Sequence, residues 1–364
     1  MEVTDVLVDL VAIPSVSPLA NLPVIEYAEK HLAGWKIKRY PYRDAAGVEK
    51  INLVAATKAG VAELALVCHT DTVPYDAAWA EAVRPVIRGG KLYGRGSCDV
   101  KGFLACVLAA IAKVDVRKLT KPLAIVLTAD EEVGCVGAKF LARKKALRAR
   151  KMVIGEPTGL RPVCAGKGYG LAEIVVRGKE AHSAFPARGR SAIFDAARVV
   201  TALERVAKKL ETRKNRAFDP PFTTLNVGLI QGGTAKNIIA GECRITVEWR
   251  PLPGQPGDWA AELIREALAG LRVAATLDVK RLDPAFDPSP TQDLVTLVET
   301  LTGHSATTVS FGSEAAHLSG LTSEVIVFGP GDMTMAHKSG EFVPVKELDA
   351  CVGYLVKLIN GLCV

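Results

Sequence analysis

The chain has 364 residues, 49% of them hydrophobic and 23% charged, and its 46 basic and 39 acidic side chains give a formal net charge of +7. This composition is ordinary for a globular protein and excludes a disordered chain, a fibrous protein and a disulfide-rich miniprotein. The length predicts about two domains, and the modest charge excess does not by itself indicate nucleic acid.

The N-terminus and the cysteines bear on the compartment. The first fifteen residues carry two Asp and one Glu before any basic residue, unlike a secretory or transit peptide. The longest apolar run, 103–112, is too short to span about 30 Å of hydrocarbon. The eight cysteines form no CxxC pair, which argues against a cysteine zinc site or a disulfide framework. We therefore expect a cytoplasmic protein without a membrane partner.

Apolar runs alternate with helical periodicity in the first half of the chain. Helices are predicted over 5–12, 24–33, 101–113 and 137–147, and strands over 63–68, 123–127 and 152–154. This order predicts an α/β domain with a largely parallel sheet. The basic run at 142–151 lies at the end of a predicted helix and has no interleaved aromatic residues, so we expect a solvated face rather than a nucleic-acid partner.

The pattern changes near residue 171. Strands are predicted over 171–177, 224–230, 243–250 and 272–281, and helices over 191–210 and 259–271. Strand–helix–strand–strand–helix–strand is typical of a split βαβ, α+β unit. After a proline-rich break at 284–290, a strand at 325–328 and a helix at 345–362 resume the first pattern. We expect a larger domain of residues 1–170 and 285–364, interrupted by an inserted domain of residues 171–284.

Acidic and histidine side chains follow the predicted strands with unusual regularity. The clusters are HTDTVP at 69–74, GRGSCDVKG at 94–102, ADEEVG at 129–134, GEPT at 155–158 and AHKSGEF at 336–342. Ligands bind at the carboxyl ends of strands in open α/β sheets, so we expect these clusters to meet there.

Each cluster also has a structural interpretation. His69 and Asp71 lie on one face of an extended chain, where His69 could be a core histidine with a local hydrogen bond. Asp99 could cap the helix that follows it, and the glycine-rich loop around it lacks the spacing of a phosphate loop. The carboxylates at 130–132 could form a solvated turn. Helix capping alone does not account for five such clusters, each placed after a predicted strand.

The residue types favour a metal site. Imidazole and carboxylate ligands suit zinc or a similar first-row ion rather than calcium. Two ions bridged by one carboxylate would use all five candidate ligands, which are His69, Asp99, Glu132, Glu156 and His337.

These motifs, with GKEAHSAFP at 178–186 and GPGDMTMAHKSGEFV at 329–343, resemble the co-catalytic di-zinc aminoacylase/carboxypeptidase family over essentially the whole chain. The resemblance implies a zinc aminopeptidase-like catalytic domain and an inserted ferredoxin-like domain that serves as lid and dimerisation surface. It also implies a homodimer that acts on a small molecule and carries two Zn²⁺, with Co²⁺ as a substitute.

The resemblance assigns roles to the candidate ligands. His69 and Glu156 would hold one zinc, Glu132 and His337 would hold the other, and Asp99 would bridge them.

Three further residues receive catalytic roles from the same resemblance. Asp71 would orient His69, and Glu131 would be the general base that passes a proton to the leaving amine. The spacing alone does not separate the roles of Glu131 and Glu132. His182 would reach the partner subunit's active site and stabilise the oxyanion.

The resemblance also implies substrate contacts. Arg250 would receive the substrate α-carboxylate, which suits the planar fork of a guanidinium. Further substrate contacts are expected at Asn237, Lys167, Gly312 and Ser313.

The variants GEPT, RPLPG and FGSEA resemble the acetylornithine deacetylase branch of the family. They imply removal of an acetyl group from an L-amino acid, with N-acetyl-L-ornithine in arginine biosynthesis as the first choice. Glu314 would either sense a substrate amine or act as a charge at a helix N-terminus. The alternatives are a succinyl-diaminopimelate desuccinylase, an acetyl-lysine or acetyl-citrulline deacylase, a metallo-carboxypeptidase or dipeptidase, and a non-catalytic binding protein on the same fold.

Overall fold

The computed structural model describes all 364 residues, whose contacts divide the chain into two units. Unit 1 comprises residues 1–164, 288–307 and 313–364, and unit 2 comprises residues 165–287 and 308–312. The expected limits of the inserted domain, 171 and 284, lie within unit 2. The short segment 308–312 was not expected there, and the lid and dimerisation role of the insert stays a prediction.

An eight-stranded sheet forms the centre of unit 1, in the order β1-β2-β6-β3-β7-β16-β8-β15. Its parallel strands are β6 (Leu123–Thr128), β3 (Ala62–His69), β7 (Ala149–Ile154) and β16 (Thr322–Val327). Strands β3 and β6 are almost entirely apolar and buried on both faces, as parallel strands covered by helices are, and β7 and β16 are apolar and buried over their C-terminal halves. The predicted α/β class is therefore confirmed. The outer strands are β1 (Lys36–Arg43), β2 (Glu49–Ala56), β8 (Val163–Gly166) and β15 (Thr307–Val309).

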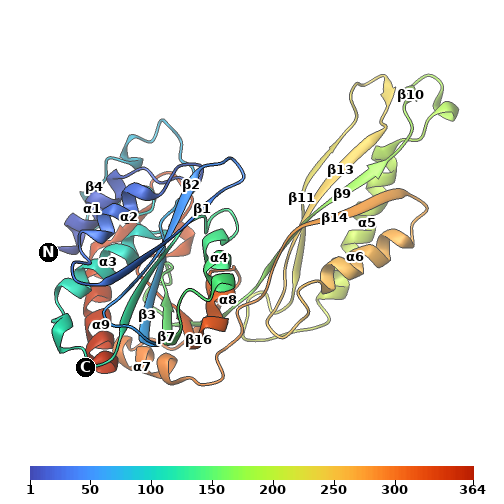
Figure 1. Cartoon of the computed structure of the whole chain (residues 1–364). Coiled ribbons are helices and arrows are strands. Elements are labelled where there is room, and N and C mark those ends of the chain that lie inside the picture. The colour runs from blue at the N-terminus through green and yellow to red at the C-terminus, as the bar shows by residue number, and fades with distance from the viewer. The chain divides into compact units, whose positions relative to one another are not determined.

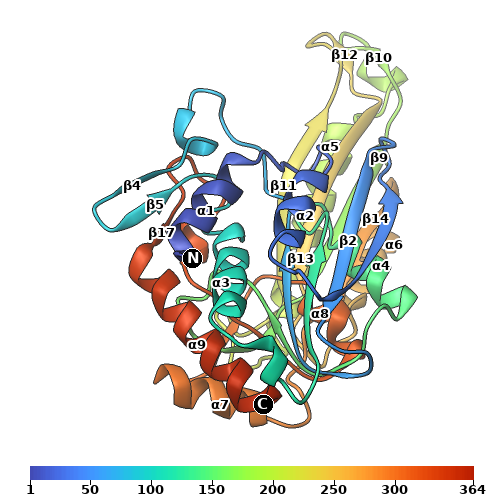
Figure 2. The same ribbon diagram turned by 60° about the vertical axis from the view of Figure 1, so that its left-hand side comes forward.

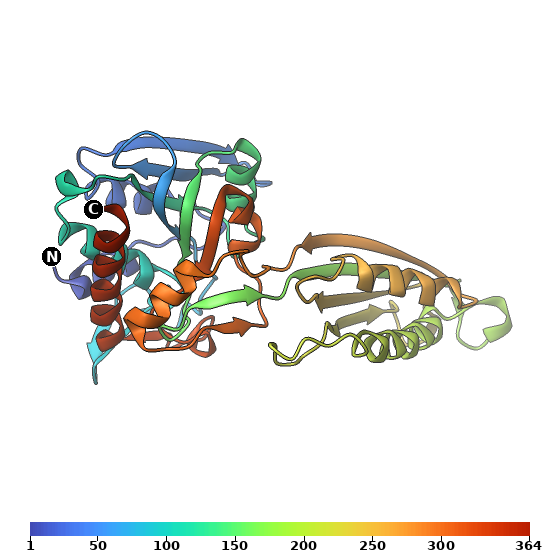
Figure 3. The same cartoon turned by 90° about the horizontal axis from the view of Figure 1, so that it is seen from below.

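Helices cover both faces of this sheet. On one face lie α1 (Val3–Ala12), α3 (Lys101–Ala112) and α9 (Val345–Cys363), and on the other lie α4 (Val136–Lys144) and α8 (Ala315–Leu318) (Figure 1). Helix α3 is apolar on nearly all sides and, except for Ala112, is buried between α1, α9 and the sheet. Helix α7 (Asp293–Thr302) packs beside α9, which ends at the C-terminus (Figure 3). The remaining elements are α2 (Leu22–Glu29) and a small sheet of β4 (Val86–Arg88), β5 (Lys91–Tyr93) and β17 (Phe342–Pro344).

Unit 2 has the predicted strand–helix–strand–strand–helix–strand order. Its strands β9 (Tyr169–Arg177), β11 (Thr224–Gly232), β13 (Glu242–Arg250) and β14 (Ala274–Asp283) form an antiparallel sheet in the order β11-β13-β9-β14. Helices α5 (Ala192–Leu210) and α6 (Trp259–Ala269) share a core with alternate residues of β9 and β13. This is the ferredoxin-like arrangement. A two-stranded pair of β10 (Ala181–His182) and β12 (Ile238–Ile239) extends from one end of the unit (Figure 2).

No helix of the structure combines the length and apolarity needed to cross a membrane.

Candidate functional site

Four of the five acidic and histidine clusters follow parallel strands of unit 1 and therefore lie at one edge of its sheet. His69 is the last residue of β3, Glu131 and Glu132 follow β6, and Glu156 follows β7. Strands β6, β3, β7 and β16 are consecutive neighbours, so their carboxyl ends lie side by side. His337 lies in the loop between β16 and β17.

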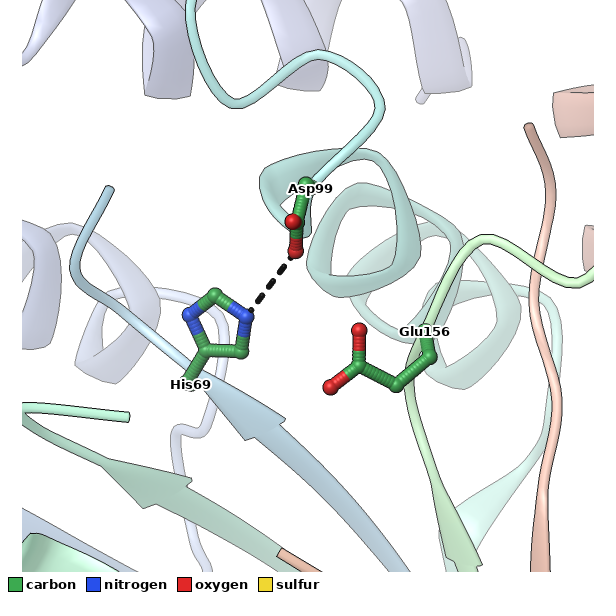
Figure 4. Close-up of side chains that lie close together, drawn as sticks. All are labelled: His69, Asp99 and Glu156. Carbon is green, nitrogen blue, oxygen red and sulfur yellow. Dashed lines mark hydrogen bonds and ion pairs between the residues drawn. The ribbon is translucent and has the colours of Figure 1, made fainter. Parts of the chain in front are cut away.

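The five predicted ligands form two groups that share Asp99. One contains His69, Asp99 and Glu156 (Figure 4), the other contains Asp99, Glu132 and His337, and the ligand atoms of each group lie within 4.8 Å of one another. Asp99 Oδ1 is 3.2 Å from His69 Nε2, and Asp99 Oδ2 is 3.2 Å from His337 Nε2. Each oxygen of this carboxylate therefore faces a different imidazole, which is the arrangement a bridging ligand needs.

The electrostatics of these groups suit a cation site. Burial opposes a positive charge on His69, yet the carboxylates of Asp71 and Asp99 outweigh it and raise the His69 pKa well above its ordinary value. Hydrogen bonds that the His337 ring donates to the carboxylates of Asp99 and Glu132 raise its pKa to about 10. Burial raises the pKa of Glu156 well above its ordinary value. Metal ligands must lose such protons, so cation binding here releases protons. The donor set fits two first-row cations.

The structure contradicts the capping interpretation of Asp99. Helix α3 begins at Lys101, its N-cap residue is Val100, and no side chain caps it. The glycines of this loop serve close packing instead. Gly96 has a φ of +82°, and a Cβ there would lie 2.8 Å from Thr72 Cγ2. The Asp99 carboxylate is thus free to face the two histidines.

Glu131 and Glu132 are adjacent in sequence but differ in surroundings. Glu132 Oε1 lies 3.2 Å from His337 Nε2, whereas Glu131 belongs to neither ligand group and contacts the Cys135 sulfur at 3.3 Å. Burial raises the pKa of Glu131 to about 8, and the neighbouring Glu132 charge adds to that rise against the opposing charge of His69. A carboxylate with a pKa near the working pH is well suited to take and return a proton.

Asp71 contacts both His69 and the turn that carries the two glutamates. Nδ1 of His69 is 3.0 Å from the Asp71 carbonyl oxygen and 3.6 Å from its Oδ1. The Asp71 carboxylate also accepts the backbone N–H groups of Glu131 at 3.0 Å and Glu132 at 3.3 Å. The sequence predicted the contact with His69 but gave no sign of this second function.

Glu341 was missed as a site residue, although it stands in the predicted AHKSGEF cluster. It is completely buried, pairs with Arg95 at 2.6 Å, and accepts the backbone N–H groups of Cys98 at 2.9 Å and Asp99 at 3.0 Å. The loop that carries His337 is therefore joined to the loop that carries Asp99 by the contacts of Glu341. Glu341 lies four residues after His337, and that spacing did not predict this role.

Three cysteines lie beside the site but belong to neither ligand group. Cys68, Cys98 and Cys135 are buried and form no disulfide, as expected for small packing residues. Burial raises the pKa of both Cys68 and Cys98, so these thiols stay protonated.

In unit 2 the structure brings His182 and Asn237 together. His182 pairs with Ile238 across β10 and β12, and the Asn237 carbonyl accepts the N–H of Ser183 at 3.0 Å. The ring of His182 is exposed, and its Nδ1 accepts the N–H of Ala184 at 3.1 Å. In the neutral ring the proton therefore sits on Nε2, which is free to donate to an oxyanion.

Arg250 is the last residue of β13 in the four-stranded sheet, at the end of that strand remote from His182. Its guanidinium stacks on Tyr169 at 4.4 Å from the ring centre, Arg281 stacks on the same ring at 4.7 Å, and Glu248 lies 3.7 Å away. Arg281 donates to the Asp283 carboxylate, whereas Arg250 has only the more distant Glu248, so Arg250 is the guanidinium suited to an anionic group.

The other expected substrate contacts have different surroundings. Lys167 is buried, and its ammonium donates to the carbonyls of Pro220 and Phe222, both at 2.7 Å. Ser313 is buried before α8, where its hydroxyl accepts the N–H of Ala315 at 3.4 Å, and Gly312 immediately precedes it. Both side chains thus have partners within the protein, and their contact with a substrate stays a prediction.

Glu314 is the N-cap residue of α8, as the helix-terminus interpretation predicts, but its side chain is completely buried. Burial raises its pKa to about 7, against the opposing charge of His69 and the hydroxyl of Thr128.

Replacing this carboxylate gives a pH-dependent prediction. A carboxyl whose pKa is higher in the folded state is destabilising once ionised, so the penalty begins above pH about 4.5 and is complete above pH about 7. In chelator-treated protein, Glu314→Gln should raise the free energy of unfolding at pH 8 by on the order of 2–3 kcal/mol, with no gain at pH 4. Denaturant titrations at both pH values measure it, and an unchanged or lower stability at pH 8 would contradict the assignment.

Comparison with known proteins agrees with this site. The model of peptidase family M20/M25/M40 matches residues 65–361, and the chain belongs to this family. It is 47% identical over 368 aligned positions to an acetylornithine deacetylase of Myxococcus xanthus, covering 98% of this chain and 96% of that protein.

Two solved structures share the fold. The aminopeptidase PepT of Bacillus cereus has 22% identity and a TM-score of 0.78, with coverage of 99% of this chain and 98% of that one. The YXEP protein of Bacillus subtilis, described as a dinuclear metal-binding peptidase of the M20 family, has 13% identity, a TM-score of 0.68 and coverage of 99% and 97%.

Proposed function

We propose that this chain is a metal-dependent amide hydrolase that converts N-acetyl-L-ornithine into L-ornithine and acetate in arginine biosynthesis, in the cytoplasm. The observation that carries the hydrolase assignment is the Asp99 carboxylate shared by two ligand groups, with Glu131 beside them. The 47% identical relative named acetylornithine deacetylase supports the substrate.

The site fits two divalent cations, for which we propose zinc, with cobalt as a substitute. His69 and Glu156 would hold one, Glu132 and His337 the other, and Asp99 both. Bound there, such cations would polarise the amide carbonyl and make water more acidic.

The chain's own residues supply the proton transfers and orientation. Glu131 takes a proton from the attacking water and delivers it to the nitrogen of the leaving amine. Asp71 holds the His69 ring and the backbone of Glu131 in fixed relation. Arg250 binds the substrate carboxylate, and the Nε2–H of His182 donates to the oxyanion.

The spacing within unit 2 supports a dimer in which His182 acts on the partner subunit's substrate. The register of β9 and β13 pairs Arg177 with Glu242 and Gly170 with Trp249. His182 follows the first pair and Arg250 follows the second, so the length of β13 separates them, about 27 Å at 3.4 Å per residue. One small substrate does not reach both residues of one chain.

The edge of unit 2 offers a surface for such a partner. Strand β11 is an edge strand, and its Leu229 and Ile230 are more than half exposed, as is Phe194 on the adjoining helix α5. Exposed apolar edge strands are usually covered in the working assembly.

A substrate panel tests the proposed activity. Purified enzyme should show its highest kcat/KM with N-acetyl-L-ornithine, compared with N-acetyl-L-citrulline, N-acetyl-L-lysine, N-succinyl-diaminopimelate and a dipeptide. Release of the free amine is measured for each, with Glu131→Gln as the blank. Preference for the succinylated substrate or the dipeptide would overturn the substrate assignment.

A further inference from the structure

Lys50 is a buried charged residue for which the proposed reaction has no use. It lies on β2, is 1% exposed, and its Nζ is 3.0 Å from Asp130 Oδ1. The same ammonium donates to the carbonyl of Leu19 at 2.7 Å and to the carbonyl of Ser17, and lies 3.7 Å from Asp44. A lysine is seldom buried so completely unless it is paired.

The partner of Lys50 stands immediately before the proposed base. Asp130 has a left-handed backbone with a φ of 58°, a conformation that residues other than glycine hold only where their surroundings fix it. Its other oxygen, Oδ2, accepts the Tyr42 hydroxyl at 2.8 Å. Tyr42 and Lys50 face each other across the β1–β2 hairpin. Lys50 and Tyr42 thus both contact the Asp130 carboxylate, and they thereby hold the backbone turn that carries Asp130 and Glu131.

A second set of contacts joins Lys50 to the same turn from the opposite side. Ser17, whose carbonyl accepts from Lys50, donates its hydroxyl to Asp71 Oδ2 at 2.7 Å. Asp71 Oδ1 accepts the backbone N–H of Glu131 at 3.0 Å. The contacts form a closed ring through Lys50, Ser17, Asp71, Glu131 and Asp130.

We propose that Lys50 is a positioning residue for hydrolysis: it fixes the Asp130 turn, and with it the direction of the Glu131 carboxylate. This rests on the proposed role of Glu131. Net stability does not explain the lysine well, because a buried ion pair is often no more stabilising than an apolar pair of similar volume. Its two hydrogen bonds to the 17–19 loop and its ion pairs with Asp130 and Asp44 instead define one arrangement of the turn.

Lys50→Met and Tyr42→Phe test the proposal, with Tyr40→Phe as a matched control. Tyr40 lies two residues before Tyr42 on the same strand, is similarly half-buried, and donates to the Ala146 carbonyl instead of Asp130. Each variant is loaded with cation, its metal content is measured, and kcat is expressed per folded, loaded chain. The substrate is whichever amide the wild type cleaves fastest.

We expect Lys50→Met to lower kcat on the order of 100-fold, since misplacement of a catalytic group by about 1 Å has such an effect. Tyr42→Phe should lower it about 10-fold, by the loss of one of the two contacts to Asp130. KM should stay within about threefold of wild type for both, and Tyr40→Phe should match wild type throughout.

If Lys50 only stabilises the fold and does not position Glu131, a different result is expected. In that case Lys50→Met lowers the melting temperature but leaves kcat per loaded chain unchanged, and Tyr42→Phe behaves like Tyr40→Phe; either finding overturns the proposal. Should Lys50→Met not fold, the Tyr42→Phe and Tyr40→Phe comparison decides alone. A wild type that cleaves no amide at all would overturn the proposed function instead.

Discussion

Glu131→Gln is expected to lower kcat by about 10³- to 10⁴-fold while KM and cation content stay near wild type. Glutamine keeps the size and polarity of the side chain but cannot accept the proton of the attacking water. The loss should be confined to kcat because Glu131 belongs to neither ligand group. Steady-state kinetics and elemental analysis of the same preparation measure both quantities.

The adjacent residue supplies the control. Glu132→Gln changes the same chemical group one position along the chain, but Glu132 lies 3.2 Å from His337 within a ligand group. That variant should lose cation content together with activity. If Glu131→Gln lost cations instead, or kept its activity, the roles of the two glutamates would have to be exchanged or abandoned.

The second large effect concerns His182. His182→Ala is expected to lower kcat by about 10²- to 10³-fold, the usual result of removing one oxyanion donor. Since the length of β13 separates Arg250 from His182 within one chain, the missing donor should be replaceable from another chain.

Mixed dimers test that replacement. The His182→Ala and Glu131→Gln variants carry different affinity tags, are co-expressed, and their heterodimers are isolated through both tags. One of the two sites then has Glu131 from its own chain and His182 from the partner chain, so activity should recover to about half of the wild-type value. Heterodimers as inactive as both parents would show that His182 does not act across the dimer.

The sequence predicted most of the fold because its central elements are unambiguous. The buried strands such as 63–68 and 123–127 are continuous apolar runs, and the alternation in 171–177 is that of a strand with one buried face. The β1–β2 hairpin was missed because β1 is polar and mostly exposed, with only alternate residues partly buried. Strand β1 forms because it pairs with β2 in the folded protein, and its hydrophobic pattern does not indicate a strand.

The candidate ligands were predictable for a related reason. His69, Glu132 and Glu156 end or follow parallel strands, and such strands bring their ends together whatever the intervening sequence. What spacing could not supply is the difference between Glu131 and Glu132. That difference arises from the left-handed Asp130, whose conformation depends on Lys50 and Tyr42, about 80 residues away in sequence.

The central claim is that two cations share Asp99 in unit 1. The most direct measurement is an anomalous difference map from crystals loaded with zinc or cobalt and collected at the absorption edge of that metal. We expect two peaks, one in contact with His69, Asp99 and Glu156 and the other with Asp99, Glu132 and His337. A single peak, or peaks that do not contact Asp99, would contradict the account.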